Sequence, residues 1–508
     1  MASKTKPLLS VYLFPDKNIH SEELISLIER LEKDHISIEI LDQNSSVPEL
    51  FTKNPRVYVS IGSNWREFPS LVSMPLHEKK RWLHFSGPDK VQSRQLFYCW
   101  LSCTEQLIEN KKLSPSRFSS DTPLISIFTA AYRSKDKIQR PFQSLLKQTY
   151  QNWEWVIVDD SDDGGETYKE YLIKLDDPRV RRYRQDEYNG YIGAVKRYAA
   201  SLCTGEILVE VDHDDELTAD CLQKIADAFK NNPDCGFVFG DCSEVYEENQ
   251  QGHWYGWDCG FGYSVYYRVW LHEMGRWQNV YRNTAINGNT LRHLVGLPNH
   301  PRAWTRECYH LAGGHREELL VADDYDLLIR TFLITKYAAI PDLLYIQYRN
   351  SNGNNSTFIR NKQIQILVKE LKDYYSQRVS SRLSELDMTG ALPYQRVWEA
   401  SRDDPFRKTT HITARNPGRK SLIFAIPYEE AKTDALYKAL EDSLENNFKD
   451  CEIIVVGDVP KDIEHFAAKA PAGAVRWWQM EEGRPLDYFI RYGEYCTSGI
   501  RQEVIICQ

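Results

Sequence analysis

The sequence predicts an α/β protein whose largest domain is built on a mainly parallel sheet. Apolar, β-branched segments alternate with amphipathic helical segments along most of the chain. Two strands predicted in the middle region end on clusters of aspartate, and such clusters meet at one edge of a parallel sheet. The last part of the chain repeats the order of strands and helices found in the middle region.

Residues 1–120 are predicted to form a small N-terminal α/β domain. Strands are expected at 8–14, 36–41 and 56–61, with a helix at 21–33. The helix carries apolar residues at helical spacing, namely Leu24, Ile25, Ile28 and Leu31. This domain shows no pattern that is typical of a catalytic site.

Residues 121–388 are predicted to form the main domain. Its elements are expected in this order: strand 124–128, a helix ending near 148, strand 155–158, strand 180–183, helix 192–202 and strand 206–211. Pro141 fits only the first turn of the helix before residue 148, or kinks it. A long amphipathic helix at 360–386 closes the domain, and residues 389–420 are expected to be a linker.

The strand predicted at 206–211 leads into the pattern that is most informative about function. It delivers Asp212 and Asp214 to its carboxyl end, although carboxylates are poor strand formers. Mg²⁺ and Mn²⁺ bind one or two protein carboxylates together with water and substrate phosphates. An isolated Asp-x-Asp is usually a solvated loop, but the strand at 155–158 also ends on acids. Two acidic strand ends at one edge favour a ligand site.

Three ordered segments carry a family resemblance. They are Ser126-Ile127-Phe128-Thr129-Ala130-Ala131-Tyr132, then Gln148 to Ser161 with Val158-Asp159-Asp160 near its end, then Asp212-His213-Asp214-Asp215. Together they resemble family-2 glycosyltransferases of the GT-A fold, over roughly residues 122–360. The resemblance implies a central GT-A-type domain, Rossmann-like with a mainly parallel sheet, that uses a nucleotide-sugar donor.

The resemblance also implies roles on the donor side. Ala130 and Tyr132 would belong to the donor site, with Tyr132 flanking the base. Asp160 would read the edge of the uracil ring, and Asp212 would lie near the ribose. Asp214, the last acid of the DXD motif, would hold Mn²⁺ or Mg²⁺. A divalent cation stabilises the charge that develops on a departing nucleotide diphosphate.

The pair Asp323-Asp324 resembles the family's Glu-Asp motif, whose second acid is the general base. Asp323 stands where the family usually has Glu. Taken alone, an acid in the first turn of a helix would be interpreted as complementing the helix dipole. Its position after the metal motif favours Asp324 as the base, a role typically worth ~10²–10⁴ in rate. Asp323 is the next candidate.

A segment from Tyr345 to Thr357 resembles the mobile loop that closes over the diphosphate. Many relatives carry His after the arginine of this loop, whereas this chain has Asn350. No metal-ligand role is therefore assigned to Asn350. Arg349 remains a candidate for a phosphate contact.

Acceptor-side candidates are less specific. The region 244–281 is crowded with aromatic residues, and Trp257 is one that could stack on a sugar, although core packing explains most of these residues equally well. His300 and Arg302 fall in a segment that lines the cleft between donor and acceptor in such enzymes. Asp323 is also kept as an acceptor-side candidate.

Composition limits the classes of function. The chain of 508 residues has a formal net charge of -9, which argues against nucleic acid as a partner. It has no apolar run near the ~20 residues of a membrane span, and its start lacks the apolar core of a signal peptide. The 11 cysteines include no C-x-x-C pair. We therefore expect a cytoplasmic protein with reduced thiols and no transmembrane segment.

Residues 421–508 are predicted to form a C-terminal α/β half-domain. Strand 422–426, helix 435–446 and strand 452–458 parallel the segment 124–160, and strand 504–508 parallels the one that delivers Asp212. This repeat has no metal motif, so no catalysis is assigned to it. Either it is a degenerate half-domain, or the sequence is a truncated piece of a longer protein.

The sequence thus predicts a metal-dependent, inverting hexosyltransferase. The donor is expected to be a nucleotide-sugar, UDP-linked in the first instance with GDP and dTDP left open, and the acceptor a hydroxyl of a glycan or polysaccharide. One alternative is a catalytically silent scaffold that binds glycan or nucleotide. Another is a nucleotidyltransferase, although the chain lacks a Gly-rich, basic loop after the first strand of the main domain.

Overall fold

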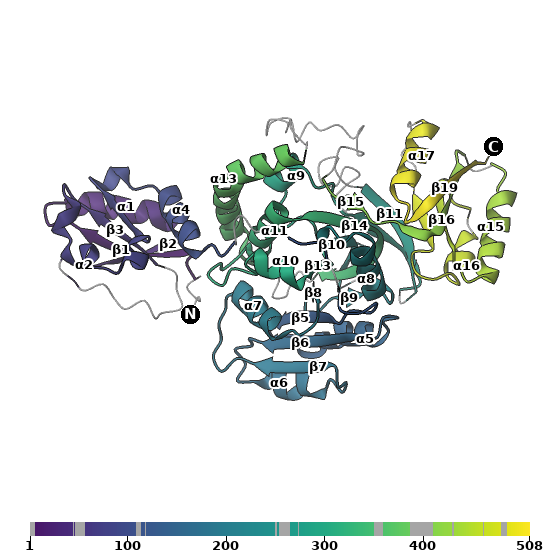
Figure 1. Ribbon diagram of the computed structural model, residues 1–508, viewed down its shortest axis with the longest axis horizontal. Coiled ribbons are helices and arrows are strands. Elements are labelled where there is room, and N and C mark those ends of the chain that lie inside the picture. Colours follow the sequence, from purple (N-terminus) through teal and green to yellow (C-terminus); the bar gives the residue numbers. More distant parts are fainter. Residues whose placement is uncertain are drawn as a thin grey trace.

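The chain forms three parts in a row in the computed structural model (Figure 1). The structure describes residues 6–43, 45, 56–107, 113–116, 118–248, 251–252, 265–272, 274–349, 359–386, 410–428, 431–460, 462–478 and 485–507. In these ranges no helix is both long enough and apolar enough to cross a membrane.

The N-terminal part has its own parallel four-stranded sheet, in the order β2-β1-β3-β4. The strands are β1 (Leu9–Pro15), β2 (Ile36–Ile40), β3 (Arg56–Ile61) and β4 (Trp82–Phe85). The helices are α1 (Ser21–Lys33), α2 (Pro69–Val72), α3 (Leu76–Lys79) and α4 (Ser93–Thr104), with 3₁₀ turns η1 (Trp65–Glu67) and η2 (Pro88–Lys90). The α/β class predicted for this region is confirmed.

The central part is built on the parallel strands β8-β5-β6-β7, with β13 antiparallel beside β8. Its strands are β5 (Ile125–Ala131), β6 (Trp153–Asp159), β7 (Val180–Arg184), β8 (Ile207–Glu210), β9 (Glu216–Leu217), β10 (Cys235–Tyr246), β11 (Val265–Leu271), β12 (Arg276–Arg282), β13 (Arg302–Thr305) and β14 (Lys336–Arg349). Its helices are η3 (Lys135–Ile138), α5 (Gln139–Leu146), α6 (Glu166–Glu170), η4 (Leu172–Lys174), α7 (Ile192–Leu202), α8 (Cys221–Asn231), α9 (Gly288–His293), α10 (Arg306–Leu311), α11 (Asp323–Ile334) and α13 (Asn361–Glu385).

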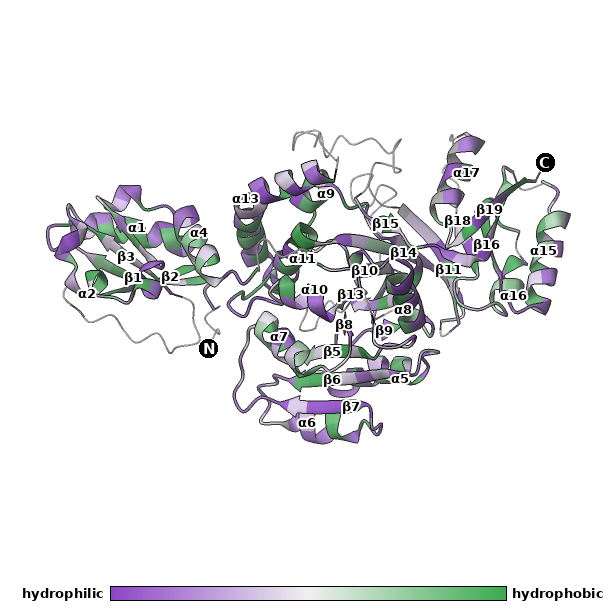
Figure 2. Ribbon diagram, in the orientation of Figure 1, coloured by the Kyte–Doolittle hydropathy of each residue, from purple (hydrophilic) through white to green (hydrophobic). Residues whose placement is uncertain are grey.

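Helices cover both faces of this sheet. Successive residues of a strand point to opposite faces. Phe128 belongs to the core that includes residues of α7, α11 and α13, whereas Ile127 belongs to the core that includes residues of α5 and α8. Figure 2 shows β6 largely hydrophobic and β7, at the edge of the sheet, hydrophilic. The predicted mainly parallel sheet is confirmed, and the carboxyl ends of β5, β6 and β8 share one edge.

The C-terminal part repeats half of the central sheet. Its elements are β15 (Ile412–Thr413), β16 (Asn416–Ile426), α15 (Asp434–Glu445), β17 (Cys451–Gly457), α16 (Ile463–Ala467), β18 (Val475–Trp478), α17 (Leu486–Tyr495) and β19 (Gly499–Ile506). The order β19-β16-β17-β18 is parallel throughout and corresponds to β8-β5-β6-β7. The repeat predicted from the sequence is therefore present in the structure.

Sequence analysis did not foresee that the two sheets are joined. Strand β18 pairs antiparallel with β11, and the β11–β12 hairpin continues to β10, which gives one 15-stranded sheet. Arg476 of β18 is buried at the join, where its guanidinium lies 2.8 Å from Asp342 and 3.0 Å from Glu452. The C-terminal part is thus attached by both backbone pairing and a buried ion-pair network.

The N-terminal part is tied to helices of the central part. Arg316 is buried and donates to the carbonyl of Leu101 (2.8 Å) and to Thr104 Oγ1 (2.9 Å) at the end of α4. The same guanidinium donates to Asp326 of α11, two residues after Asp324. Arg316 therefore links the helix that carries the predicted base to the N-terminal part.

Candidate active site

Strand β8 carries the acidic motif to the edge of the sheet. All four of its residues are buried, and Val211 and Asp212 follow it directly. Asp215 is also buried, where its oxygens accept hydrogen bonds from the Tyr345 hydroxyl (2.9 Å) and the Tyr348 amide (2.7 Å). Asp212 and Asp214 keep 32% and 26% of their side chains exposed. Asp215 therefore fixes the turn, and the other two acids can meet a ligand.

Two buried cations lie among the acids of the site. Lys196 of α7 donates to Glu210 at 2.5 Å and lies 4.0 Å from Asp212. Arg302, at the start of β13, donates to Asp324 at 3.1 Å and lies 3.9 Å from Glu210. Burial opposes the ionisation of Glu210, but Lys196 outweighs it and holds the pKa of this carboxyl well below its usual range.

Asp323 and Asp324 begin α11 but lie in different surroundings. Asp323 is buried, and burial raises its pKa above the usual range. Asp324 keeps 31% of its side chain exposed and accepts from the amide of Tyr325 at 2.7 Å. Burial acts against its ionisation, but Arg302 and Lys196 lower its pKa overall. Of the two, Asp324 is thus the more accessible acid and the one whose ionised form its neighbours favour.

A glycine lets α7 approach the start of α11. A Cβ placed on Gly193 would lie 2.6 Å from the carbonyl oxygen of Arg316 and 2.9 Å from the Cβ of Asp323. Any other residue would push the two helices apart. Because Lys196 lies one turn further along α7, this close approach also places its ammonium among the acids.

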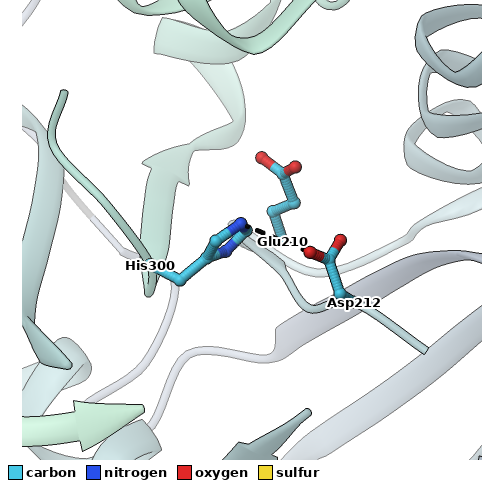
Figure 3. Close-up of side chains that lie close together, drawn as sticks. All are labelled: Glu210, Asp212 and His300. Carbon is cyan, nitrogen blue, oxygen red and sulfur yellow. Dashed lines mark ion pairs between the residues drawn. The ribbon is translucent and has the colours of Figure 1, made fainter. Parts of the chain in front are cut away.

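His300 completes a cluster with two of the acids. One ligand atom each from Glu210, Asp212 and His300 lie within 4.8 Å of one another, and His300 Nε2 is 3.6 Å from Asp212 (Figure 3). The imidazole is buried and stacks on Tyr345, with 4.9 Å between the ring centroids. Burial and Arg302 lower its pKa, so it is neutral and able to bind a metal ion.

The predicted nucleoside contacts gather around one loop. Asp160, at the end of β6, accepts from the amides of Asn189 (2.7 Å) and Gly190 (2.9 Å), and burial raises its pKa. The Tyr132 ring, after β5, lies 5.6 Å from that of Tyr188. Ala130, near the end of β5, is partly buried. These residues lie at the same sheet edge as Asp212.

Arg349 ends β14 and pairs with Glu244 of β10. In this structure its guanidinium thus has an acidic partner from the protein. Two further predictions, for Trp257 and Asn350, fall outside the described residues.

Sequence reasoning overlooked three members of the site, Lys196, Glu210 and His315. His315 Nε2 lies 3.7 Å from Glu210 and 3.9 Å from Asp323. A lysine on the apolar face of α7 and a glutamate on a buried strand were the available signals, since charged residues are rarely buried without a partner.

Residues 126–293 match the family model described as Glycosyl transferase family 2. The matched range also includes the site residues that precede residue 293, namely Ala130, Tyr132, Asp160, Lys196, Glu210, Asp212 and Asp214. It ends before His300, Arg302 and Asp324.

Several curated proteins are similar to parts of the chain. A glycosyl transferase named for colanic acid biosynthesis, WcaA of Escherichia coli (strain K12), is 37% identical over 98 residues, which cover 19% of this chain and 35% of that protein. A chondroitin synthase of Pasteurella multocida (strain Pm70) is 23% identical over 361 residues, covering 68% of this chain and 34% of that protein.

A third relative is the UDP-Glc:alpha-D-GlcNAc-diphosphoundecaprenol beta-1,3-glucosyltransferase WfgD of Escherichia coli. It is 30% identical over 122 residues, which cover 24% of this chain and 46% of WfgD. The matched parts therefore span between a third and a half of these relatives.

Proposed function

We propose that this chain, whose central part is a family 2 glycosyltransferase domain, transfers a sugar from a nucleotide-sugar to a hydroxyl of a glycan, with inversion at the anomeric carbon. One observation carries the proposal. Asp324 contacts the buried cation Arg302, Asp212 contacts the buried cation Lys196, and Glu210 of β8 contacts both cations. A general base thus lies beside a group of carboxylates suited to a divalent cation.

Asp324 is proposed as the general base. Its exposed, ionised carboxylate can accept the proton of an acceptor hydroxyl while the oxygen attacks the anomeric carbon. The bond to the diphosphate breaks as the new glycosidic bond forms, and a single displacement inverts the configuration. Arg302 holds Asp324 in place through its 3.1 Å contact, and Asp323, being buried, is less suited to this role.

The side chains just after β8 offer oxygen ligands that suit Mn²⁺ or Mg²⁺. Asp212 and Asp214 are partly exposed carboxylates, and His300 Nε2 faces Asp212. Glu210 already accepts from Lys196, so Asp214 and Asp212 are the proposed ligands, with His300 within reach. When bound, the ion would stabilise the charge of the departing diphosphate.

The nucleoside is proposed to be uridine. Asp160 and Tyr132 lie at the same sheet edge as Asp212, which suits a base beyond the ribose. The relative WfgD is named as a UDP-Glc-dependent glucosyltransferase, which supports UDP ahead of GDP or dTDP. Arg349 would reach a phosphate only after leaving Glu244, so its contact is proposed for the donor-bound protein.

Asp324→Asn tests the assignment of the base. It keeps the size of the side chain and removes its basicity, so we expect kcat for UDP-sugar transfer to fall ~10²–10⁴-fold. Donor affinity, measured calorimetrically with Mn²⁺, should stay within a few-fold because the base contacts the acceptor. Asp458→Asn, an exposed acid in the C-terminal part, is the matched control.

Each contrary result has a definite meaning. Retained transfer would move the base to Asp323, and lost donor binding would place Asp324 in the nucleotide site. In a third outcome, the wild-type protein binds UDP with Mn²⁺ and yet releases no nucleotide from UDP-, GDP- or dTDP-sugars in the presence of glycan acceptors. That result would identify the chain as a catalytically silent scaffold.

A further inference from the structure

The N-terminal part reaches the proposed nucleoside site through Lys6, which lies just before β1. Its Nζ atom donates to the carbonyl oxygen of Asn189 at 3.0 Å. Its backbone is also held, because the buried side chain of Gln363 in α13 donates to the Lys6 carbonyl at 2.8 Å. Both the backbone and the ammonium group of this residue are therefore anchored on the central part.

The loop that Lys6 contacts is the loop that Asp160 binds. It connects β7 to α7, and Asp160 accepts hydrogen bonds from its amides at Asn189 and Gly190. Asn189 is thus held from two sides, its amide by a carboxylate and its carbonyl by an ammonium group. Burial raises the pKa of Asp160, whereas the two amides and Lys6 favour its ionised form. Because charged hydrogen bonds are stronger than neutral ones, the loss of Lys6 would loosen this loop.

Two tyrosine rings of the same loop lie close to the ammonium group. Lys6 Nζ is 5.1 Å from the ring centroid of Tyr188 and 5.0 Å from that of Tyr191, which is within the range of a cation–π contact. Tyr188 is 42% exposed, and its ring centroid lies 5.6 Å from that of Tyr132. Lys6 thus fixes the aromatic neighbour of the residue that is proposed to flank the base.

Gly190 makes room for this contact. Its φ of +72° lies in the left-handed region that favours glycine. A Cβ placed on Gly190 would lie 2.5 Å from Lys6 Nζ and 2.9 Å from the Tyr188 ring. A side chain at this position would therefore displace the ammonium group from the loop.

We infer that Lys6 is a positioning residue of the donor site, through which the N-terminal part orders the loop 188–191 beside the nucleoside. Lys6 contacts the loop and not the substrate, so it acts on donor affinity through Asn189 and Tyr188. The chemical step, which depends on Asp324, is left unchanged. The inference rests on the proposed function for the location of the nucleoside, and its test separates binding from transfer.

Lys6→Met keeps the length of the side chain and removes its charge and its hydrogen-bond donor. We expect the Kd for UDP, measured calorimetrically on the full chain with Mg²⁺, to rise about tenfold, because a charge-assisted hydrogen bond that orders the loop is lost. Lys6→Arg keeps a charged donor and should restore most of the affinity. In transfer assays, the KM for the donor should rise in Lys6→Met while kcat stays near the wild-type value.

Inorganic pyrophosphate distinguishes an ordered loop from a general loss of positive charge. It shares the diphosphate of UDP and lacks the nucleoside, so its affinity with Mg²⁺ should be equal in the wild type and in Lys6→Met. Arg94→Gln is the matched control. Arg94 joins α4 to α13 by ion pairs with Glu370 and Asp373, about two helical turns from Gln363. Its loss should leave UDP binding unchanged.

The inference is overturned if a folded Lys6→Met protein binds UDP as tightly as the wild type does. It is also overturned if pyrophosphate binding weakens as much as UDP binding, or if Arg94→Gln weakens UDP binding to the same extent. If Lys6→Met does not fold, Gln363→Leu, which releases the backbone of Lys6, replaces it, and an unchanged UDP affinity overturns the inference.

Two results separate the inference from the proposed function. UDP binding that depends on Lys6 in a protein without transfer activity would support the inference and refute only the proposed transfer. A wild-type protein that binds no UDP would refute the proposed uridine site, and the inference with it.

Discussion

The half-sheets β8-β5-β6-β7 and β19-β16-β17-β18 share one polar framework. In the central half, Ser126 donates to Glu154, which also accepts from Thr204, and Gly205 donates to Ser126. In the C-terminal half, the same contacts join Ser421, Glu452, Ser498 and Gly499. An arginine contacts each glutamate at 3.0 Å, Arg181 in one half and Arg476 in the other.

The halves differ at the carboxyl edge. Phe128 pairs with Glu210 in the central sheet, whereas its counterpart Ile423 pairs with Val504. Two residues further on, Asp212 corresponds to Ile506. The framework that shapes the half-sheet is thus independent of the acids at its edge. We expect folding to depend on the polar framework and the proposed chemistry to depend on the acids at the edge of the sheet.

The largest expected effect comes from removing the proposed metal ligand from the half that has it. Asp214→Ala should lower UDP-sugar transfer about 10³-fold or more, because the developing charge loses its cation. The melting temperature should change little, since the side chain is partly exposed at a strand end. Asp458→Ala, just after β17, which is the counterpart of β6, should change neither. Full transfer in EDTA would contradict the metal assignment.

A second effect should distinguish the two copies of the framework. Glu452 and Arg476 are almost fully buried, so Glu452→Gln leaves a buried charge poorly paired and should cost about 3–5 kcal/mol of unfolding free energy. Arg181 keeps 35% of its side chain exposed, so Glu154→Gln should cost only about 1–3 kcal/mol. Denaturant unfolding of both variants measures the difference. Equal losses would mean that burial does not set the contribution of the framework.

The smallest effect concerns the charges that only the central half possesses. Arg302 and Lys196 lower the pKa of Asp324, so the base stays ionised until the pH falls below its usual range. Arg302→Gln removes one cation, and the acidic limb of the kcat profile should move up by about one pH unit. Arg501→Gln, which removes an exposed arginine of β19, is the control and should leave the acidic limb unchanged. If the acidic limb of the kcat profile stays at the same pH in the Arg302 variant, a group other than Asp324 determines its position.

The framework was easier to predict than the active site because its pattern is local. Helix α7 matches the predicted range, 192–202, since its apolar residues recur at helical spacing. The predicted strands lie within a few residues of β5, β6, β7 and β8. The acids that follow β6 and β8 were also visible, because acids at strand ends are unusual.

The cations of the site could not be predicted in this way. Lys196 and its partner Glu210 are 14 residues apart in the sequence, and Arg302 and its partner Asp324 are 22 residues apart. Each charge is tolerated inside only because of a partner that no local pattern identifies. The pairing of β11 with β18 is harder still, because the two strands lie about two hundred residues apart.

That pairing has a consequence for how the molecule loses its structure. A backbone ladder that runs from β10 through the hairpin to β18 couples the unfolding of the central and C-terminal parts. Opening β18 would strip hydrogen bonds from β11 and uncover Asp342 at once. The N-terminal part has a sheet of its own and meets the rest through side chains such as Arg316. We therefore expect unfolding of the C-terminal part to be coupled to the central part by backbone pairing, and that of the N-terminal part by side-chain contacts and a shared apolar core.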